Sequence, residues 1–221
     1  NADDPPMRDL ICSTVEVLEA NPEAVVAYPD WVMIDASGAE IRTVRTLEYS
    51  QQALVADYVC IPGPGALIRR AALEGDVLRD PRYRFVSDYA LWLRLSLKGS
   101  MVRCPVVLAT WRRHHAGATA RGRGIALAAE FRTVIQDFFG QPELPSEVRQ
   151  WERQARAMAT YHAAIQKLYD SSVPGRRLML RSLVTPFRRR SSYATYRRRP
   201  LVVLAVFLSP IGTRIVRRKS G

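Results

Sequence analysis

The chain has 221 residues, of which 48% are hydrophobic and 24% are charged, and its formal net charge is +12. This composition excludes a disordered chain and is typical of one globular domain with an appendage. Residues 171–221 contain 12 Arg and 1 Lys without any acid, whereas residues 1–170 contain 20 basic and 21 acidic residues. The body is therefore close to neutral, unlike a nucleic-acid-binding protein that is basic throughout. Cys12, Cys60 and Cys104 are odd in number and widely spaced, which indicates reduced thiols in a cytosolic setting rather than disulfides or a zinc site.

The first part of the chain alternates between loop, helix and strand patterns. An acidic loop at Asn1–Asp4 is followed by apolar residues at helical spacing from Met7 to Leu18, which predict a helix. The apolar runs Ala24–Tyr28 and Trp31–Ile34 predict buried strand, and Asp35–Gly38 predicts the turn of a hairpin. This alternation is typical of an α/β domain.

The middle of the chain is less regular. Residues 42–60 lack a clear period and predict an irregular loop, and Ile61–Gly65 contains two Pro and two Gly that force a turn. A short helix is expected within Arg70–Leu78. Two further strands are expected, separated by Pro105 where an edge or bend tolerates proline: Met101–Cys104 and Val106–Trp111.

A helix is predicted to start near Ser87 and Asp88. Either side chain can accept hydrogen bonds from backbone N–H groups of the first turn, and Leu91, Trp92 and Leu95 then follow at helical spacing. An acid at a helix start is ordinarily a cap. A second interpretation, catalytic chemistry at Asp88, depends on the motifs that accompany it.

The sequence after residue 125 predicts helices and then a basic tail. A first helix is expected through Phe138, a second one capped by Ser146 and ending near Tyr169 with His162 as a core residue, and a third one beginning at Pro174. The last apolar run, Leu201–Leu208, is too short to span a bilayer, which takes about 20 residues. Together with the flanking Arg clusters it suits an anionic membrane surface, although a solvated tail with a docking helix, or nucleic-acid contact, would also account for it.

The acids at the start of the chain are candidate metal ligands. Asn1, Asp3 and Asp4 lie in a loop before a helix, and carboxylates this close repel one another unless a cation binds them. Mg²⁺ and Mn²⁺ prefer such oxygen ligands together with substrate phosphates. Taken alone, the four residues could equally be a helix-start cluster.

Taken in order, the motifs resemble those of family 2 glycosyltransferases with the GT-A fold. The resemblance covers residues 1 to about 120 and rests on the following segments: Asn-Ala-Asp-Asp at 1–4, Val-Ala-Tyr-Pro-Asp at 26–30, Ile-Asp-Ala-Ser-Gly at 34–38, Ile-Pro-Gly-Pro-Gly-Ala-Leu-Ile-Arg-Arg at 61–70, Ser-Asp-Tyr-Ala-Leu-Trp-Leu-Arg-Leu at 87–95 and Trp-Arg-Arg-His at 111–114. It implies an incomplete GT-A domain, Rossmann-like with a mixed sheet, at residues 1–124. Residues 125–221 would then form a helical and basic region with a predicted contact to the membrane surface.

The resemblance also implies a donor site near the start of the chain. Asp3 would bind the divalent cation that bridges the diphosphate of a nucleotide-diphospho-sugar, and Asn1 would occupy the first position of the same motif, where many relatives have Asp. Asp4 would support the loop. His114 is the further candidate metal ligand, with His115 as the fallback.

Asp88 would be the general base that takes the proton of the acceptor hydroxyl in an inverting transfer. Ser87, together with Gly63 and Gly65 of the acceptor-side loop, would contact the acceptor. No Gln-x-x-Arg-Trp motif follows the base, which favours transfer of one sugar per encounter over processive synthesis. About 90 residues that begin the family's domain and hold the nucleoside are absent here. We therefore expect a fragment that is inactive by itself.

The leading expectation is a metal-dependent glycosyltransferase fragment of cell-envelope polysaccharide synthesis, acting on a saccharide or lipid-linked acceptor at the cytoplasmic face of the membrane. One alternative is a non-catalytic membrane- or partner-binding module in which the acids are caps and the basic tail is the functional part. Another is a nucleic-acid binder driven by the tail, which would bind any duplex in a salt-dependent way.

Overall fold

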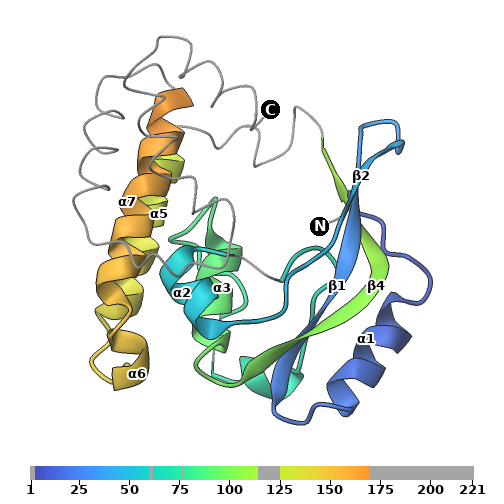
Figure 1. The fold of residues 1–221 in the computed structure, drawn as a ribbon, viewed down its shortest axis with the longest axis horizontal. Coiled ribbons are helices and arrows are strands. Elements are labelled where there is room, and N and C mark those ends of the chain that lie inside the picture. The colour runs from blue at the N-terminus through green and yellow to red at the C-terminus, as the bar shows by residue number, and fades with distance from the viewer. Residues whose placement is uncertain (1–2, 60–61, 76, 114–124, 170–221) are drawn as a thin grey trace. The chain divides into compact units, whose positions relative to one another are not determined.

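The computed structural model describes residues 3–59, 62–75, 77–113 and 125–169 (Figure 1). Helices and strands are mixed along the first part of the chain and helices follow, in this order: α1 Leu10–Glu19, β1 Ala24–Ile34, β2 Glu40–Val44, α2 Gln51–Asp57, β3 Leu67–Ile68, a short 3₁₀ helix η1 at Arg70–Leu73, α3 Ser87–Leu95, β4 Ser100–Arg112, α5 Ile125–Phe139, α6 Ser146–Arg149 and α7 Glu152–Tyr169. The predicted α/β class is therefore confirmed.

The chain divides into two compact units. One contains Asn1–Leu54, Val59–Arg82 and Ser87–Arg121, and the other contains Val55–Tyr58, Tyr83–Val86 and Gly122–Gly221. The sequence predicts one boundary after residue 124. In the structure, the second unit also contains residues 55–58, 83–86 and 122–124. The roles predicted for the two parts of the chain stay predictions.

Strand β1 is the centre of a four-stranded sheet in the first unit. It pairs in parallel with β4 along its whole length, so β2 and β3 share its other edge, antiparallel to it. Most of β1 is buried, as expected for a continuous apolar run covered on both faces. The hairpin predicted at Asp35–Gly38 is confirmed, because the Gly38 N–H donates to the Asp35 carbonyl and β2 returns along β1.

The two strands expected around Pro105 are a single strand, β4. Opposite Pro29 and Asp30 of β1, the pairing jumps from Cys104 to Val107, so that two residues of β4 bulge out of the ladder. Pro105 is tolerated there because β4 is an edge strand: among the described strands, it pairs with β1 alone. A proline within an otherwise apolar run can thus indicate a bulge rather than the end of a strand.

Residues 42–60 are not one irregular loop, as the sequence suggests. Strand β2 continues to Val44, and α2 forms at Gln51–Asp57. The Ser50 hydroxyl caps this helix by accepting from the Ala53 N–H at 3.2 Å, and Leu54 is fully buried. A seven-residue helix has too few turns for a clear period and depends on its tertiary contacts.

Other helices are shorter than expected. Helix α1 begins at Leu10 rather than Met7, and it buries Leu10 against Cys104 and Leu108 of β4. The helix expected within Arg70–Leu78 is only the single turn of η1.

The second unit contains the helices that the apolar spacing predicts after residue 125. Helix α5 is as expected, but the helix expected from Ser146 to Tyr169 is two helices, α6 and α7. Pro145 takes the position before α6 and Ser146 lies in its first turn, where no side-chain cap bond forms. His162 of α7 lies among aromatic rings, 4.3 Å from Tyr58 and 5.5 Å from Phe131 between ring centroids.

None of the helices in the described part of the chain is both long and apolar enough to cross a membrane. The helix predicted from Pro174, the apolar run at Leu201–Leu208 and the Arg clusters lie outside the described residues.

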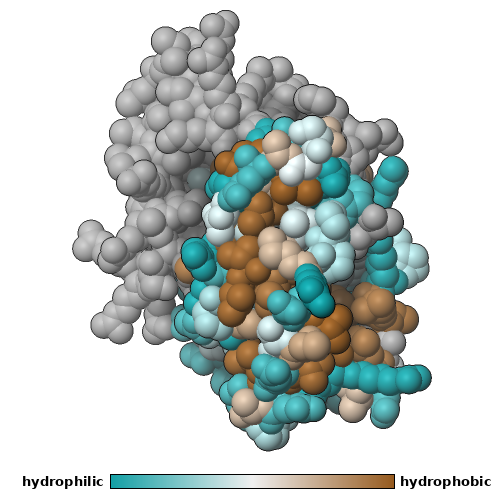
Figure 2. Space-filling model, turned by 90° about the vertical axis from the view of Figure 1, so that its right-hand side faces the viewer, coloured by the Kyte–Doolittle hydropathy of each residue, from teal (hydrophilic) through white to brown (hydrophobic). Residues whose placement is uncertain are grey.

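The outer edge of β4 is partly covered by the start of the chain. The Met7 N–H donates to the Leu108 carbonyl at 2.9 Å, and the Thr110 hydroxyl donates to the Pro5 carbonyl at 2.7 Å. Figure 2 views the molecule from the side on which α1 and β4 lie in Figure 1, and apolar side chains gather on that surface. Ile11 of α1 and Val106 of β4 are large apolar residues of these elements that stay exposed.

Gly65 and Gly75 allow a matched test of the packing in the first unit. Both have positive φ, +80° and +71°, but a Cβ at Gly65 would lie 2.7 Å from the Ala109 Cβ, whereas a Cβ at Gly75 would meet nothing within 4 Å. Gly65→Ala is expected to destabilise by about 2–4 kcal/mol, since backbone strain and overpacking add. Gly75→Ala is expected to cost about 1 kcal/mol from backbone strain alone. Equal urea midpoints for the two variants would contradict the close packing at Gly65.

Candidate functional site

Six of the predicted site residues lie within the described part of the chain. They belong to the first unit and are Asp3, Asp4, Gly63, Gly65, Ser87 and Asp88. Asn1, His114 and the fallback His115 lie outside the described residues. Their predicted roles stay predictions.

The acidic segment lies against the end of β4. The Arg112 backbone N–H donates to Oδ1 of Asp4 at 2.7 Å, and the Arg112 Nε donates to the Asp3 carbonyl at 3.0 Å. The contacts of Pro5 and Met7 with β4 keep the chain alongside this strand, so the first residues reach its carboxyl end. Two motifs that are more than a hundred positions apart in the sequence thus come together.

Arg112 also joins this segment to the turn between β1 and β2. Its Nη1 donates to the carbonyls of Asp35 and Ala36 at 3.0 and 3.2 Å. The turn is held by the Asp35 carboxylate, which accepts from the Ser37 hydroxyl and from the backbone N–H groups of Ser37 and Ala39. The hydrogen bond from the Ser37 hydroxyl contributes most to holding the pKa of Asp35 below its ordinary value. One guanidinium therefore organises two loops at the same end of the sheet.

The described residues fit a divalent cation only in part. Asp3 and Asp4 supply oxygen atoms of the kind that Mg²⁺ and Mn²⁺ prefer, but the Asp4 carboxylate accepts a backbone N–H. Among the residues that the structure describes, no three His, Cys, Asp or Glu side chains are grouped to hold a metal ion. The remaining predicted metal ligand, His114, lies outside the described residues, as does Asn1.

The glycine-rich loop passes close to a pair of tryptophans. A Cβ built on Gly63 would lie 3.0 Å from Nε1 of Trp31, and the rings of Trp31 and Trp111 meet edge to face at 5.9 Å between centroids. Gly65 is fixed by packing against Ala109, as described above. Trp111 directly precedes Arg112, so the loop, the aromatic pair and the acidic segment are on connected elements. Sequence reasoning missed Trp31, which had no signal beyond its position after Asp30.

Ser87 and Asp88 begin α3, as predicted. Ser87 is buried, and its hydroxyl accepts from Nε of Arg79 at 3.2 Å. Asp88 is exposed, and its Oδ1 accepts from the Tyr89 N–H at 2.7 Å. Helix α3 is held in turn by the buried Tyr89, whose hydroxyl donates to the Leu54 carbonyl at 3.0 Å.

The environment of Asp88 suits a group that accepts a proton. Burial raises the pKa of the Asp88 carboxyl, while the Tyr89 N–H and the charge of Arg79 oppose the shift. Asp88 is accessible to water, but the protein around its carboxyl group still disfavours the charged form. A substrate can therefore reach the Asp88 carboxyl, and an accessible carboxyl with a raised pKa can act as a general base.

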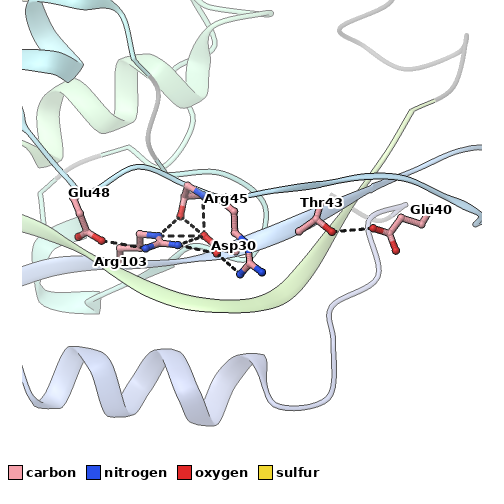
Figure 3. A network of polar contacts seen from close by, with 7 residues as sticks. Asp30, Glu40, Thr43, Arg45, Glu48 and Arg103 are labelled. Carbon is pink, nitrogen blue, oxygen red and sulfur yellow. Dashed lines mark hydrogen bonds and ion pairs between the residues drawn. The ribbon is translucent and has the colours of Figure 1, made fainter. Parts of the chain in front are cut away.

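A buried ionic network in the sheet was not predicted (Figure 3). Asp30 of β1 has no exposed surface, and it accepts from Arg103 of β4 at 2.8 and 2.9 Å, from Arg45 at 3.1 Å, and from the N–H and hydroxyl of Thr46 at 2.8 Å each. Arg103 also bonds Glu48 at 3.2 Å. The network fixes the chain after β2 against the sheet.

The hydrogen bonds decide the charge state of Asp30. Burial raises the pKa of its carboxyl, but the bonds from Thr46, Arg103 and Arg45 outweigh burial and hold the pKa below its ordinary value. Arg45 is 68% exposed, so this partner of Asp30 reaches the surface although Asp30 itself is buried. The sequence indicates such a network only by an acid in the middle of an apolar strand, because a buried acid requires a partner.

No protein-family model matches the chain, and no curated protein sequence matches it.

Proposed function

We propose that this chain is the acceptor-side and metal-binding part of an inverting glycosyltransferase that resembles family 2 of the GT-A fold. The observation that carries the proposal is the hydrogen bond between the Arg112 N–H and Asp4, which joins the acidic motif to the end of β4 as the motif order predicts. Asp88, exposed at the start of α3 with a raised pKa, supports it as the base.

In the proposed reaction, an acceptor hydroxyl oxygen attacks the anomeric carbon of a nucleotide-diphospho-sugar. The new glycosidic C–O bond forms as the C–O bond to the diphosphate breaks, and the bonding pair leaves with the nucleoside diphosphate. The acceptor proton passes to the Asp88 carboxylate. Ser87 and Gly63 lie on the segments proposed to contact the acceptor, with Gly65 shaping the loop.

We further propose that Mg²⁺ or Mn²⁺ binds at Asp3 with His114, and that Asn1 contacts the ribose or phosphate of the donor. Such a cation, when bound, takes up negative charge on the departing diphosphate. The acceptor class is a saccharide or lipid-linked saccharide of the cell envelope. The basic tail would hold the enzyme at the anionic cytoplasmic face of the membrane, at roughly 1 kcal/mol per basic residue near the surface.

The test is a screen of radiolabelled nucleotide-sugars with Mn²⁺, both for the 221-residue chain and for any longer gene product that contains it. We expect one donor to release its sugar at least about tenfold faster than without protein. A chelator should return this rate to the rate without protein.

Two outcomes would contradict this proposal. Equal rates with and without protein for every donor would exclude the transferase. If the same protein then floated with anionic but not with neutral vesicles, the alternative of a non-catalytic membrane-binding module would account for the chain.

A further inference from the structure

Two tryptophans lie next to each other near the carboxyl ends of strands β1 and β4. Trp31 of β1 pairs with Ala109 of β4, and Trp111 lies two residues beyond Ala109, so the three side chains are on the same face of the sheet. The indole rings of Trp31 and Trp111 are 5.9 Å apart between centroids and nearly perpendicular, at 84°. We call these two residues the tryptophan corner. Both belong to the first unit.

The tryptophan corner follows a closely packed part of the same face. A Cβ built on Gly65 would lie 2.7 to 3.0 Å from side-chain atoms of Ala109, Leu10 and Pro29. Pro29 and Ala109 each precede one of the tryptophans by two residues, so the packed layer and the corner are neighbours on this face. Both tryptophans are nevertheless only partly buried. Large aromatic rings that stay accessible beside a packed layer are typical of ligand sites and interfaces.

The indole N–H groups of the corner are available to a ligand. In the part of the chain that the structure describes, neither indole N–H has a hydrogen-bond partner. A Cβ on Gly63 would lie 3.0 Å from Nε1 of Trp31, so a glycine at this position leaves that N–H uncovered. A wholly apolar partner would bury both donors without acceptors, which costs free energy. The ligand that fits must therefore supply hydrogen-bond acceptors as well as apolar surface.

A pyranose ring has both properties. One face of the ring is a row of C–H groups that stacks on an aromatic ring, and the hydroxyl groups around its rim accept hydrogen bonds from N–H donors. A nucleobase is flat and apolar on both faces and suits parallel aromatic surfaces, whereas the two indoles are nearly perpendicular. The position also suits a ligand site, because ligands of open α/β sheets bind outside the carboxyl ends of the strands, and parallel β1 and β4 both end here (Figure 1).

We propose that Trp31 and Trp111 bind a sugar ring of the acceptor, through stacking on an indole face and hydrogen bonds from the indole N–H groups. This inference rests on the proposed function, which makes the bound saccharide an acceptor. Trp111 directly precedes Arg112, whose backbone N–H donates to Asp4 of the proposed donor motif at 2.7 Å. A sugar held in the corner therefore lies beside the segment proposed to bind the donor.

The test uses the indole N–H signals of the full chain in ¹⁵N NMR spectra, because this measurement needs no turnover. The chain has four tryptophans, and each signal is assigned from the corresponding Trp→Phe variant. Trp151 is the matched control, since it is also partly buried but belongs to the second unit. The probes are maltotriose, cellotriose and chitotriose, and in a separate arm uridine diphosphate. Each is added up to about 50 mM, well above the millimolar dissociation constants of weak sites.

We expect at least one trisaccharide to shift the signals of Trp31 and Trp111 saturably and to leave that of Trp151 unchanged. Trp31→Phe and Trp111→Phe keep an aromatic ring but lose the N–H, so each should weaken binding about fivefold, the effect of about one hydrogen bond. Gly63→Ala should also weaken binding, because its methyl group would cover Nε1 of Trp31. Trp151→Phe should bind as the wild type does.

The transfer assay gives a second readout. Trp31→Phe and Trp111→Phe should raise the acceptor KM about fivefold and leave kcat and the donor KM unchanged, as expected for residues that bind the acceptor equally in the ground state and the transition state.

Four results would contradict parts of this scheme. If no trisaccharide shifted the signals of Trp31 and Trp111, or if Trp151 shifted equally, the saccharide site would be refuted. Shifts with uridine diphosphate alone would assign the corner to a nucleotide instead. Unchanged affinity in both Phe variants would refute the role of the N–H donors. Saturable saccharide binding without transfer from any donor would refute the proposed function and leave the saccharide site in place, so the two failures are distinguishable.

Discussion

Replacing Asp88 with Asn is expected to lower the rate of sugar transfer by about 10²–10⁴-fold, the contribution typical of a positioned general base. The amide keeps the size of the side chain, and its Oδ1 can still accept from the Tyr89 N–H, but it cannot take the acceptor proton. The donor KM should stay the same, since the donor is proposed to bind at the other motif. The measurement is kcat and KM for the active form found in the donor screen.

The pH profile follows from the raised pKa of Asp88. A base must be deprotonated, so the wild-type rate should rise with pH through a value above the ordinary carboxyl pKa, and Asp88→Asn should lack this limb. A carboxyl with a raised pKa in the folded state stabilises the fold most when it is protonated, and that contribution is lost as pH rises through the folded pKa. Asp88→Asn should therefore be at least as stable as the wild type at neutral pH.

Glu147→Gln is the matched control, because Glu147 is an exposed acid in the first turn of another helix, α6. It should leave the transfer rate unchanged. If Asp88→Asn and Glu147→Gln had the same rate as the wild type, Asp88 would be only a helix-start residue.

Replacing Asp30 with Ala is expected to destabilise the fold by about 3–5 kcal/mol, the usual cost of removing one partner of a buried ion pair. The loss leaves Arg103, which is 17% exposed, and the Thr46 hydroxyl without their buried acceptor. Urea unfolding followed by circular dichroism measures the effect. Glu48→Gln is the control: Glu48 contacts the same Arg103 but is 78% exposed, so its replacement should cost less than about 1 kcal/mol.

The stability that Asp30 provides should depend on pH. Its folded-state pKa is lowered, so the contribution is fully present above the unfolded carboxyl pKa of about 3.9 and is lost as pH falls through the folded value. At acidic pH, the difference in the free energy of unfolding between the wild type and Asp30→Ala should therefore become smaller. A difference that stayed constant down to pH 2 would contradict the assignment of an ionised, hydrogen-bonded carboxylate.

The parts of the fold that follow from local pattern could be predicted. The buried run of β1, the turn at Asp35–Gly38 and the apolar face of α5 all depend on residues close in sequence. The single strand β4 and the helix α2 could not be predicted in this way. The first depends on the bulge of β4 at Pro105 opposite Pro29 and Asp30 of β1, and the second depends on the burial of Leu54, whose carbonyl accepts from the distant Tyr89 hydroxyl.

The same division applies to the candidate site. The residue types at Asp3, Asp4 and Asp88 carry their own signal, because acids at loop ends and helix starts are recognisable. The part played by Arg112 depends on a contact between the two ends of the first 120 residues.

The membership of residues 55–58 and 83–86 in the second unit has a consequence for how this protein can be divided. The polypeptide passes from one unit to the other five times, so no single cut separates them. Expressing residues 1–124 alone would strip Tyr83 and Val86 of α5 and leave backbone donors open to solvent beside the helix that begins at Ser87. Gene fusions and truncations designed around one linker would therefore remove residues from both units, because each unit is assembled from several separate stretches of the chain.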